Sequence, residues 1–141
     1  METKNKTVLT IEATVNAPVA KVWEYWNEPK HITQWAFASD DWHAPYAEND
    51  LRTGGSFKTT MAAKDGSFSF DFGGVYDNVK KHELIEETLG DGRKVKVIFQ
   101  ANGDQTHIVE SFEAEDQNPH DMQQAGWQMI LNNFKKYTEA K

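Results

Sequence analysis

The sequence has 141 residues, a length that fits one domain spanning residues 1–141. Its net charge of −7 and pI of about 5.2 argue against binding to nucleic acid or to an anionic membrane surface, because both need a basic patch. Because the chain has no Cys, disulfides, thiolate nucleophiles and zinc–thiolate sites are excluded.

The composition also bears on location and on the core. Residues 1–10 contain no apolar run that resembles a signal sequence, and no stretch reaches the roughly eighteen apolar residues of a membrane-spanning helix. We therefore expect a soluble cytoplasmic protein with no membrane partner. Eight Phe, five Trp and four Tyr are a large supply of rings for one core. This excess favours a cavity lined with aromatic side chains, although a Trp-rich core would account for it equally well.

The first part of the chain predicts a strand followed by two short helices. Residues 7–15 alternate apolar and polar side chains, as a half-buried strand does. Residues 16–18, Asn-Ala-Pro, are typical of a helix start, and apolar side chains then recur at helical spacing as far as Trp26. Pro29 ends this helix and starts a second one that reaches Trp35.

The middle of the chain predicts strands joined by tight turns. Residues 36–52 have a weak pattern, which we interpret as an irregular strand or loop. The alternating segments that predict strands are Phe57–Met61, Phe68–Phe72, Leu84–Leu89, Lys94–Gln100 and Thr106–Phe112. Asp-Gly or Asn-Gly pairs at 65–66, 91–92 and 102–103 are hairpin turn signals. The pair Gly73-Gly74 indicates a bulge or a tight bend.

The last stretch predicts one long amphipathic helix from Asn118 to Ala140. Asn118 can cap this helix, and Pro119 suits its first helical position. The residues that recur on one face are Met122, Gly126, Trp127, Ile130, Leu131, Phe134 and Tyr137. A glycine inside a helix lowers its stability, so we expect Gly126 to lie against a neighbouring backbone of the sheet. We expect Trp127 to be largely buried between sheet and helix.

Together these elements predict an α+β fold. Consecutive hairpins form an antiparallel meander, and a sheet of many strands twists and curls. We therefore expect a curved antiparallel sheet of about six to seven strands wrapped around the long C-terminal helix, with two short helices after the first strand.

The order and spacing of several motifs resemble one protein family. These motifs are the stretch from Ile11 to Trp23 with Pro29 and Trp35, the stretch from Asp50 to Phe57 with Met61, the segments Asp65-Gly66 and Gly74–Tyr76, and Gly126-Trp127 with Leu131, Phe134 and Tyr137. They resemble the activator of heat shock protein 90 ATPase homologues, within the SRPBCC (START-like, Bet v allergen-like) superfamily. The resemblance covers residues 7–139 and implies a helix-grip fold with an apolar pocket between sheet and helix.

The same resemblance suggests a possible protein partner. The family is named after a eukaryotic co-chaperone in which a domain of this kind is joined to an additional amino-terminal region. This chain has no room for that region, so we expect a chaperone-associated, ATPase-stimulating role only as an alternative.

The sequence contains no familiar catalytic, metal-binding or nucleotide-binding motif. Its five His residues lie in separate segments without metal-ligand spacing. There is no nucleophile elbow, and the glycine pairs lack the strand-turn-helix context of a phosphate loop. We therefore predict no metal, no cofactor and no catalytic residue.

Glu110 departs from the apolar pattern of the last predicted strand. Alternation places it on one face with Thr106, Ile108 and Phe112. If this is the inner face, Glu110 orients a ligand or exchanges protons with a raised pKa. If the face carrying His107 is the inner one, or if a bulge or strand end intervenes, the Glu110 carboxylate reaches water.

We predict that a cavity between sheet and helix binds a small hydrophobic molecule, either lipid-like or aromatic. The predicted ligand-binding residues are Trp35, Phe57, Met61, Phe70, Phe72, Val97, Glu110, Trp127, Ile130 and Leu131. The alternatives are an enzyme of the same architecture, such as a cyclase or hydrolase that uses Glu110, and the chaperone-associated partner. Binding is the expectation that we place before catalysis.

Overall fold

A computed structural model describes residues 7–141, so the prediction about a signal sequence falls largely on residues outside the described part. The elements are β1 (Val8–Val15), α1 (Val19–Asn27), α2 (Pro29–Trp35), β2 (Trp42–Asn49), β3 (Ser56–Ala63), β4 (Ser69–Lys80), β5 (Leu84–Leu89), β6 (Lys94–Asn102), β7 (Gln105–Glu113) and α3 (His120–Glu139). Among the described residues, no helix combines the length and the apolar character needed to cross a membrane.

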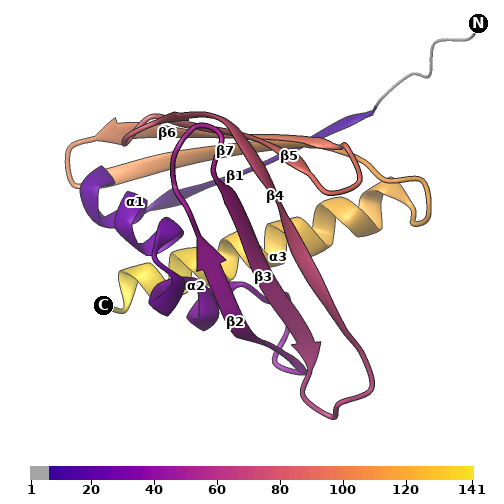
Figure 1. The fold of residues 1–141 in the computed structure, drawn as a ribbon. Helices are drawn as coiled ribbons and strands as arrows, with labels where there is room; N and C mark the ends of the chain where they lie inside the picture. The colour runs from indigo at the N-terminus through magenta and orange to yellow at the C-terminus, as the bar shows by residue number, and fades with distance from the viewer. Residues whose placement is uncertain (1–6) are drawn as a thin grey trace, which may run out of the picture.

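The seven strands form one antiparallel sheet in the order β1-β7-β6-β5-β4-β3-β2. Figure 1 shows this sheet curved over α3, with α1 and α2 beside the C-terminal half of that helix. The sequence-predicted helix-grip α+β fold is therefore confirmed. The weakly patterned segment after α2 contains one regular strand, β2, at the edge of the sheet.

Helix α3 is attached along its length to the edge strand β1. The Gln124 and Gln128 side-chain amides donate to the carbonyl oxygens of Thr10 and Glu12 at 2.9 and 3.2 Å. The Lys135 ammonium donates to the Thr14 carbonyl at 2.8 Å. These carbonyls belong to alternate residues of β1, whose other edge pairs with β7. The helix thus covers backbone groups that an edge strand would otherwise expose.

A cluster of rings fills the space between the sheet and the C-terminal half of α3. Phe134 is fully buried, and its ring centroid lies 4.9 Å from those of both Trp26 and Trp35. Trp26 also meets Phe99 of β6 at 5.6 Å, edge to face. Edge-to-face rings at these distances attract each other beyond the effect of burial alone. This half of the protein is therefore a packed aromatic core.

Two local predictions, a bulge at Gly73-Gly74 and a cap at Asn118, are wrong. Gly73 and Gly74 keep regular pairing, and the irregularity of β4 lies between Tyr76 and Asn78. Glycine occurs at 73 and 74 because a Cβ atom would strike a carbonyl oxygen, of Phe57 on β3 or of Thr88 on β5.

The start of α3 also differs from the prediction. The helix begins at His120 with Pro119 at its N-cap, and Asn118 does not cap it. The Asn118 side chain instead donates to the Glu115 carboxylate at 2.9 Å, because the connector before the helix folds back on itself.

Candidate functional site

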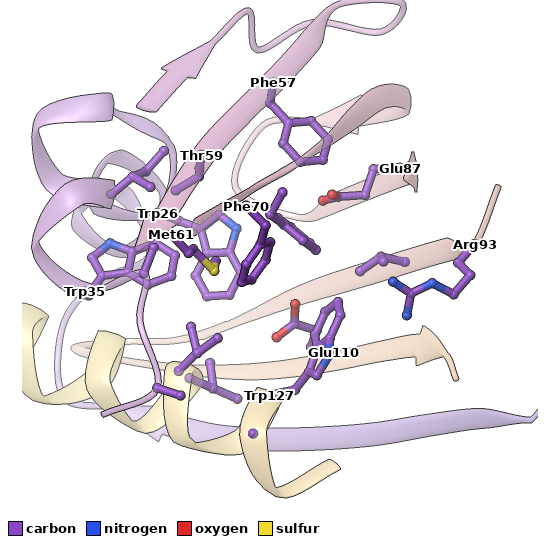
Figure 2. Close-up of a pocket in the computed structure, with 18 of the residues that line it drawn as sticks. Trp26, Trp35, Phe57, Thr59, Met61, Phe70, Glu87, Arg93, Glu110 and Trp127 are labelled. Atoms are coloured by element: carbon purple, nitrogen blue, oxygen red, sulfur yellow. The ribbon is translucent and has the colours of Figure 1, made fainter. Parts of the chain in front are cut away.

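A cavity of about 470 Å³ lies between the inner face of the sheet and the N-terminal half of α3. A volume of this size is within the range of small-molecule sites. Nine of the ten residues predicted to bind a ligand lie around it, namely Trp35, Phe57, Met61, Phe70, Phe72, Glu110, Trp127, Ile130 and Leu131. Val97 lies in the core beside the cavity, whereas Val95, two residues earlier on the same face, lines it. Figure 2 shows Trp26, Trp35 and Met61 at one end of this space.

The N-terminal half of α3 leaves space beside the sheet instead of filling it. A Cβ atom built at Gly126 would have no neighbour within 4 Å, and Gly126 lines the cavity. The prediction that Gly126 touches a sheet backbone is therefore wrong. Trp127 is half-buried, not fully buried, because it also lines the cavity. Met122 lines the cavity too and is 60% exposed, so it lies at the rim instead of in the core.

Two glutamates point into the cavity from neighbouring parts of the sheet. Glu110 on β7 pairs with Val97 of β6, and Glu87 on β5 pairs with Val95 of β6. The two carboxyl groups therefore lie on one face with a single strand between them, and Figure 2 shows both turned toward the same space. Glu87 and Glu110 are 8% and 9% exposed.

The inner face of β7 is the one that carries Glu110. Thr106, Ile108 and Phe112 are buried with it, as alternation requires. His107 lies on the outer face, where its ring nitrogens bond to Thr14 Oγ1 and to Glu12 Oε1, each at 2.8 Å. Of the alternatives that the sequence left open, the structure shows Glu110 inside and His107 outside.

Burial changes the acidity of both glutamates. Loss of solvation raises the pKa of Glu110 to about 8. Loss of solvation also raises the pKa of Glu87 to about 8, and the nearby charges of Glu110 and Asp77 add to the effect. Among the described residues, none donates a hydrogen bond to either carboxyl group. Near neutral pH both groups therefore hold protons.

A polar part of the cavity wall beside Glu87, which pairs with Tyr76 across β4 and β5, is already hydrogen-bonded. The Tyr76 hydroxyl donates to Asn49 Oδ1 at 2.5 Å, and the Asn49 amide donates to the Asn27 carbonyl at 2.7 Å. Burial, followed by the charge of Glu87, raises the pKa of Tyr76, so its hydroxyl stays protonated. These bonds hold α1, β2 and β4 together beside the cavity.

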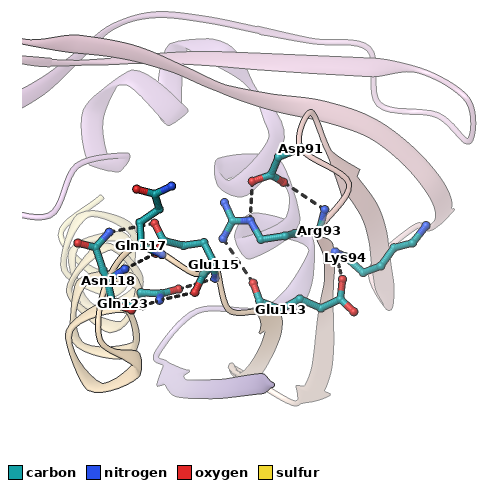
Figure 3. Close-up of polar contacts among 8 residues, drawn as sticks. All are labelled: Asp91, Arg93, Lys94, Glu113, Glu115, Gln117, Asn118 and Gln123. Carbon is teal, nitrogen blue, oxygen red and sulfur yellow. Dashed lines mark hydrogen bonds and ion pairs between the residues drawn. The ribbon is translucent and has the colours of Figure 1, made fainter. Parts of the chain in front are cut away.

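The rim near the start of α3 carries two groups of polar contacts, drawn in Figure 3. Arg93 Nε contacts Asp91 Oδ2 at 2.7 Å, and Arg93 Nη1 donates to the Glu113 carbonyl at 3.4 Å. The Gln123 amide donates to the carbonyl oxygens of Glu115 and Asn118 at 3.1 and 2.7 Å. Gln123 is buried, and these bonds satisfy its amide. The bonds of Gln123 fix the first turn of α3 at the edge of the cavity.

One group of possible metal ligands exists among the described residues, and it lies on α1, α2 and the residue between them. Glu24, Glu28 and His31 place one ligand atom each within 4.8 Å of one another. His31 Nδ1 is bonded to the Tyr137 hydroxyl at 2.8 Å, and Glu28 meets Lys30 at 3.5 Å. These contacts account for the group as a surface ion-pair cluster. None of its three residues lines the cavity.

Comparison with known proteins agrees with this architecture. Residues 16–139 match the family described as Activator of Hsp90 ATPase homolog 1-like protein. The chain belongs to this family. Among curated proteins, no match is found.

Solved structures of other proteins are similar over nearly the full length of both chains. The AHSA1-like protein of Aeromonas hydrophila is 42% identical, with a TM-score of 0.89 over 95% of this chain and 93% of that one. A protein of Cytophaga hutchinsonii is 63% identical, with a TM-score of 0.80 over 93% and 91% of the two chains. A Staphylococcus aureus protein of unknown function, 16% identical with a TM-score of 0.76 and 96% of each chain covered, shares the fold alone.

Glu87 is the buried acid of this AHSA1-like protein that the sequence did not lead us to predict. The signal was present, because Glu87 alternates with Ile85 and Leu89, which are both buried. Two aliphatic residues on one face of a strand predict that this face is buried, and Glu87, which lies between them on the same face, is then buried as well.

Proposed function

We propose that the protein binds a small apolar or aromatic molecule in the cavity between the sheet and α3. One observation carries the proposal: the half of the interior around Phe57, Phe72 and Trp127 remains hollow while the other half is packed with rings. Cavities of this volume that combine apolar walls with a few polar groups are typical of ligand sites. The physiological role of the ligand is not part of this proposal.

Tryptophan fluorescence offers a direct test, because Trp26, Trp35 and Trp127 all line the cavity. The test compounds are phenylalkanols of increasing chain length. We expect saturable quenching, with affinity that rises with chain length until the cavity is full. Absence of saturable quenching for every length would contradict the proposal.

A matched pair of variants separates binding in the cavity from binding at the surface. Gly126→Leu places a side chain in open space beside the cavity and should weaken binding by at least about tenfold, because it occupies the ligand's volume. Ala125→Leu adds leucine at the exposed neighbouring position and should leave affinity unchanged. Equal effects of the two variants would locate binding elsewhere.

The paired carboxyl groups favour a second candidate function, proton transfer on the bound molecule. Groups with a pKa of about 8 exchange protons readily near neutral pH. Phenylbutanone in deuterium oxide provides the test, since exchange of the hydrogens beside its carbonyl is visible by proton NMR. Catalysed exchange that Glu110→Gln abolishes would support an enzymatic function. Exchange at the rate of the buffer would instead support binding without catalysis. Of the roles considered, a chaperone partner has no observation of its own in its favour.

A further inference from the structure

The most unusual feature of the cavity is a pair of buried acids without protein partners. Glu87 and Glu110 are each more than nine-tenths buried and face the cavity, and no described residue donates a hydrogen bond to either carboxyl group. Their carboxyl oxygens are not fully enclosed by protein atoms, and buried polar groups nearly always have a partner, so water or a ligand within the cavity is the natural partner of these two groups.

The other titratable groups around the cavity are already engaged. Tyr76 of β4 donates to Asn49, and Glu48 of β2 accepts from Tyr46. The residues that line the cavity from α1, α2, β3 and α3 include no titratable side chain.

The two titratable groups at the rim are engaged as well. Arg93, between β5 and β6, contacts Asp91 and the Glu113 carbonyl. Glu115, in the connector, accepts from the backbone of Gln117 and Asn118. No described cation therefore neutralises the two buried acids.

We propose that the natural ligand is an organic cation, with an apolar or aromatic body and a protonated amine head that lies between the carboxyl groups of Glu87 and Glu110. This inference rests on the proposed binding function. An ammonium group has three donors and a full positive charge, so it can satisfy both acids at once through charge-assisted hydrogen bonds. A metal ion is disfavoured there, because the only cluster of three ligand groups among the described residues lies elsewhere.

The shape of the cavity fits such a molecule. Figure 2 shows Glu87 and Glu110 toward one end and Trp26, Trp35 and Met61 toward the other, so a charged head and an apolar tail have separate places. Phe72 and Trp127, whose ring centroids are 5.8 Å apart, also line the cavity. Aromatic rings tolerate and attract organic ammonium groups. The net charge of −7 further favours approach of a cation over that of an anion.

Three compounds with one body and different heads test the inference: phenylbutylamine, phenylbutanol and phenylbutyrate. At about pH 8 we expect the amine to bind at least about tenfold more tightly than the alcohol, and the acid to bind most weakly. Since the carboxyl groups hold protons near neutral pH, amine binding should release protons. Calorimetry in two buffers of different ionisation enthalpy measures this release.

Variants connect the preference to the two acids. Glu87→Gln combined with Glu110→Gln should abolish the preference for the amine and keep the affinity for the alcohol. Glu86→Gln removes the same charge one residue away on the outer face of β5, and it should keep the preference for the amine. Thermal melts check that each variant is folded, and the two single variants are measured as well.

The outcomes distinguish this inference from the proposed function. If the alcohol binds as tightly as the amine at every pH, or if the amine binds more tightly as the pH falls, the cation is wrong and the binding cavity stands. If none of the three compounds binds to the wild-type protein, both the inference and the proposed function fail.

Discussion

The indole of Trp127 stacks face to face on the ring of Phe112, with ring centroids 3.9 Å apart and an interplanar angle of 7°. Phe112 is 1% exposed on β7, the strand next to the edge strand β1, so this stack joins α3 to that side of the sheet beside the cavity. This stacking contact attaches the N-terminal half of α3 to the sheet, whereas most of that half borders the cavity.

Replacement of Trp127 by Ala should therefore lower the free energy of unfolding by about 2–3 kcal/mol, below the cost in a filled core because one side of the indole faces the cavity. Urea denaturation followed by circular dichroism measures the change. Trp127→Phe keeps a ring on Phe112 and should cost less than half as much. Equal losses for Ala and Phe would mean that the stack contributes nothing.

The acidity of the two buried glutamates predicts an unusual dependence of stability on pH. Their folded pKa values of about 8 lie above the ordinary value of 4.5, so the folded state holds protons that the unfolded state releases. Their contribution to stability is complete below the unfolded pKa and is lost as the pH rises through the folded pKa. Wild-type stability should therefore fall between about pH 5 and about pH 9 relative to Glu87→Gln Glu110→Gln.

Urea denaturation across this pH range measures the difference, which should reach at least about 1 kcal/mol in favour of the double variant. The Glu86→Gln control should follow the wild-type curve. Parallel curves for the wild type and the double variant would show that the two acids reach water in solution.

Two glycines should respond in opposite directions to a single methyl group. Gly126→Ala should raise the free energy of unfolding by about 0.5–1 kcal/mol, because alanine is the better helix former and nothing lies within 4 Å of the new Cβ. Gly74→Ala should lower the free energy of unfolding by about 1–3 kcal/mol, because the new methyl group meets the Thr88 carbonyl oxygen. Thermal and urea unfolding of both variants test the pair, and loss of stability in Gly126→Ala would mean that this position is filled.

Much of the fold follows from local patterns in the sequence. The alternation that predicts β1 matches the burial of Ile11 and Val15. The Asp65-Gly66 pair predicts the hairpin between β3 and β4, and Gly66 adopts the positive φ, 79°, that such a turn needs. Helix α3 follows from apolar spacing that brings Leu131 and Phe134 onto one buried face. These signals depend on neighbours in the chain, so they need no knowledge of tertiary contacts.

The hollow part of the interior could be predicted only in outline. A glycine in a helix gives the same sequence signal whether a neighbouring backbone or open space lies beside it. The prediction of a neighbouring backbone at Gly126 was therefore wrong, because open space lies there. Gln123 is buried because its amide bonds the connector before α3, a partnership set by the path of the chain. Which acids face each other depends on strand order, and β5 and β7 become neighbours across β6 only in the folded sheet.

The attachment of α3 to β1 has a consequence for the proposed ligand, because it closes one side of the cavity. Hydrogen bonds at Gln124, Gln128 and Lys135 hold that side of the helix closed along its length. On the far side the helix backbone stays more distant from β3 and β4, and Phe70 and Met122 are exposed there at the rim. We therefore expect the proposed ligand to pass between α3 and the β3–β4 hairpin, and we expect side chains at this gap to set its rate of exchange and side chains deeper inside to set its affinity.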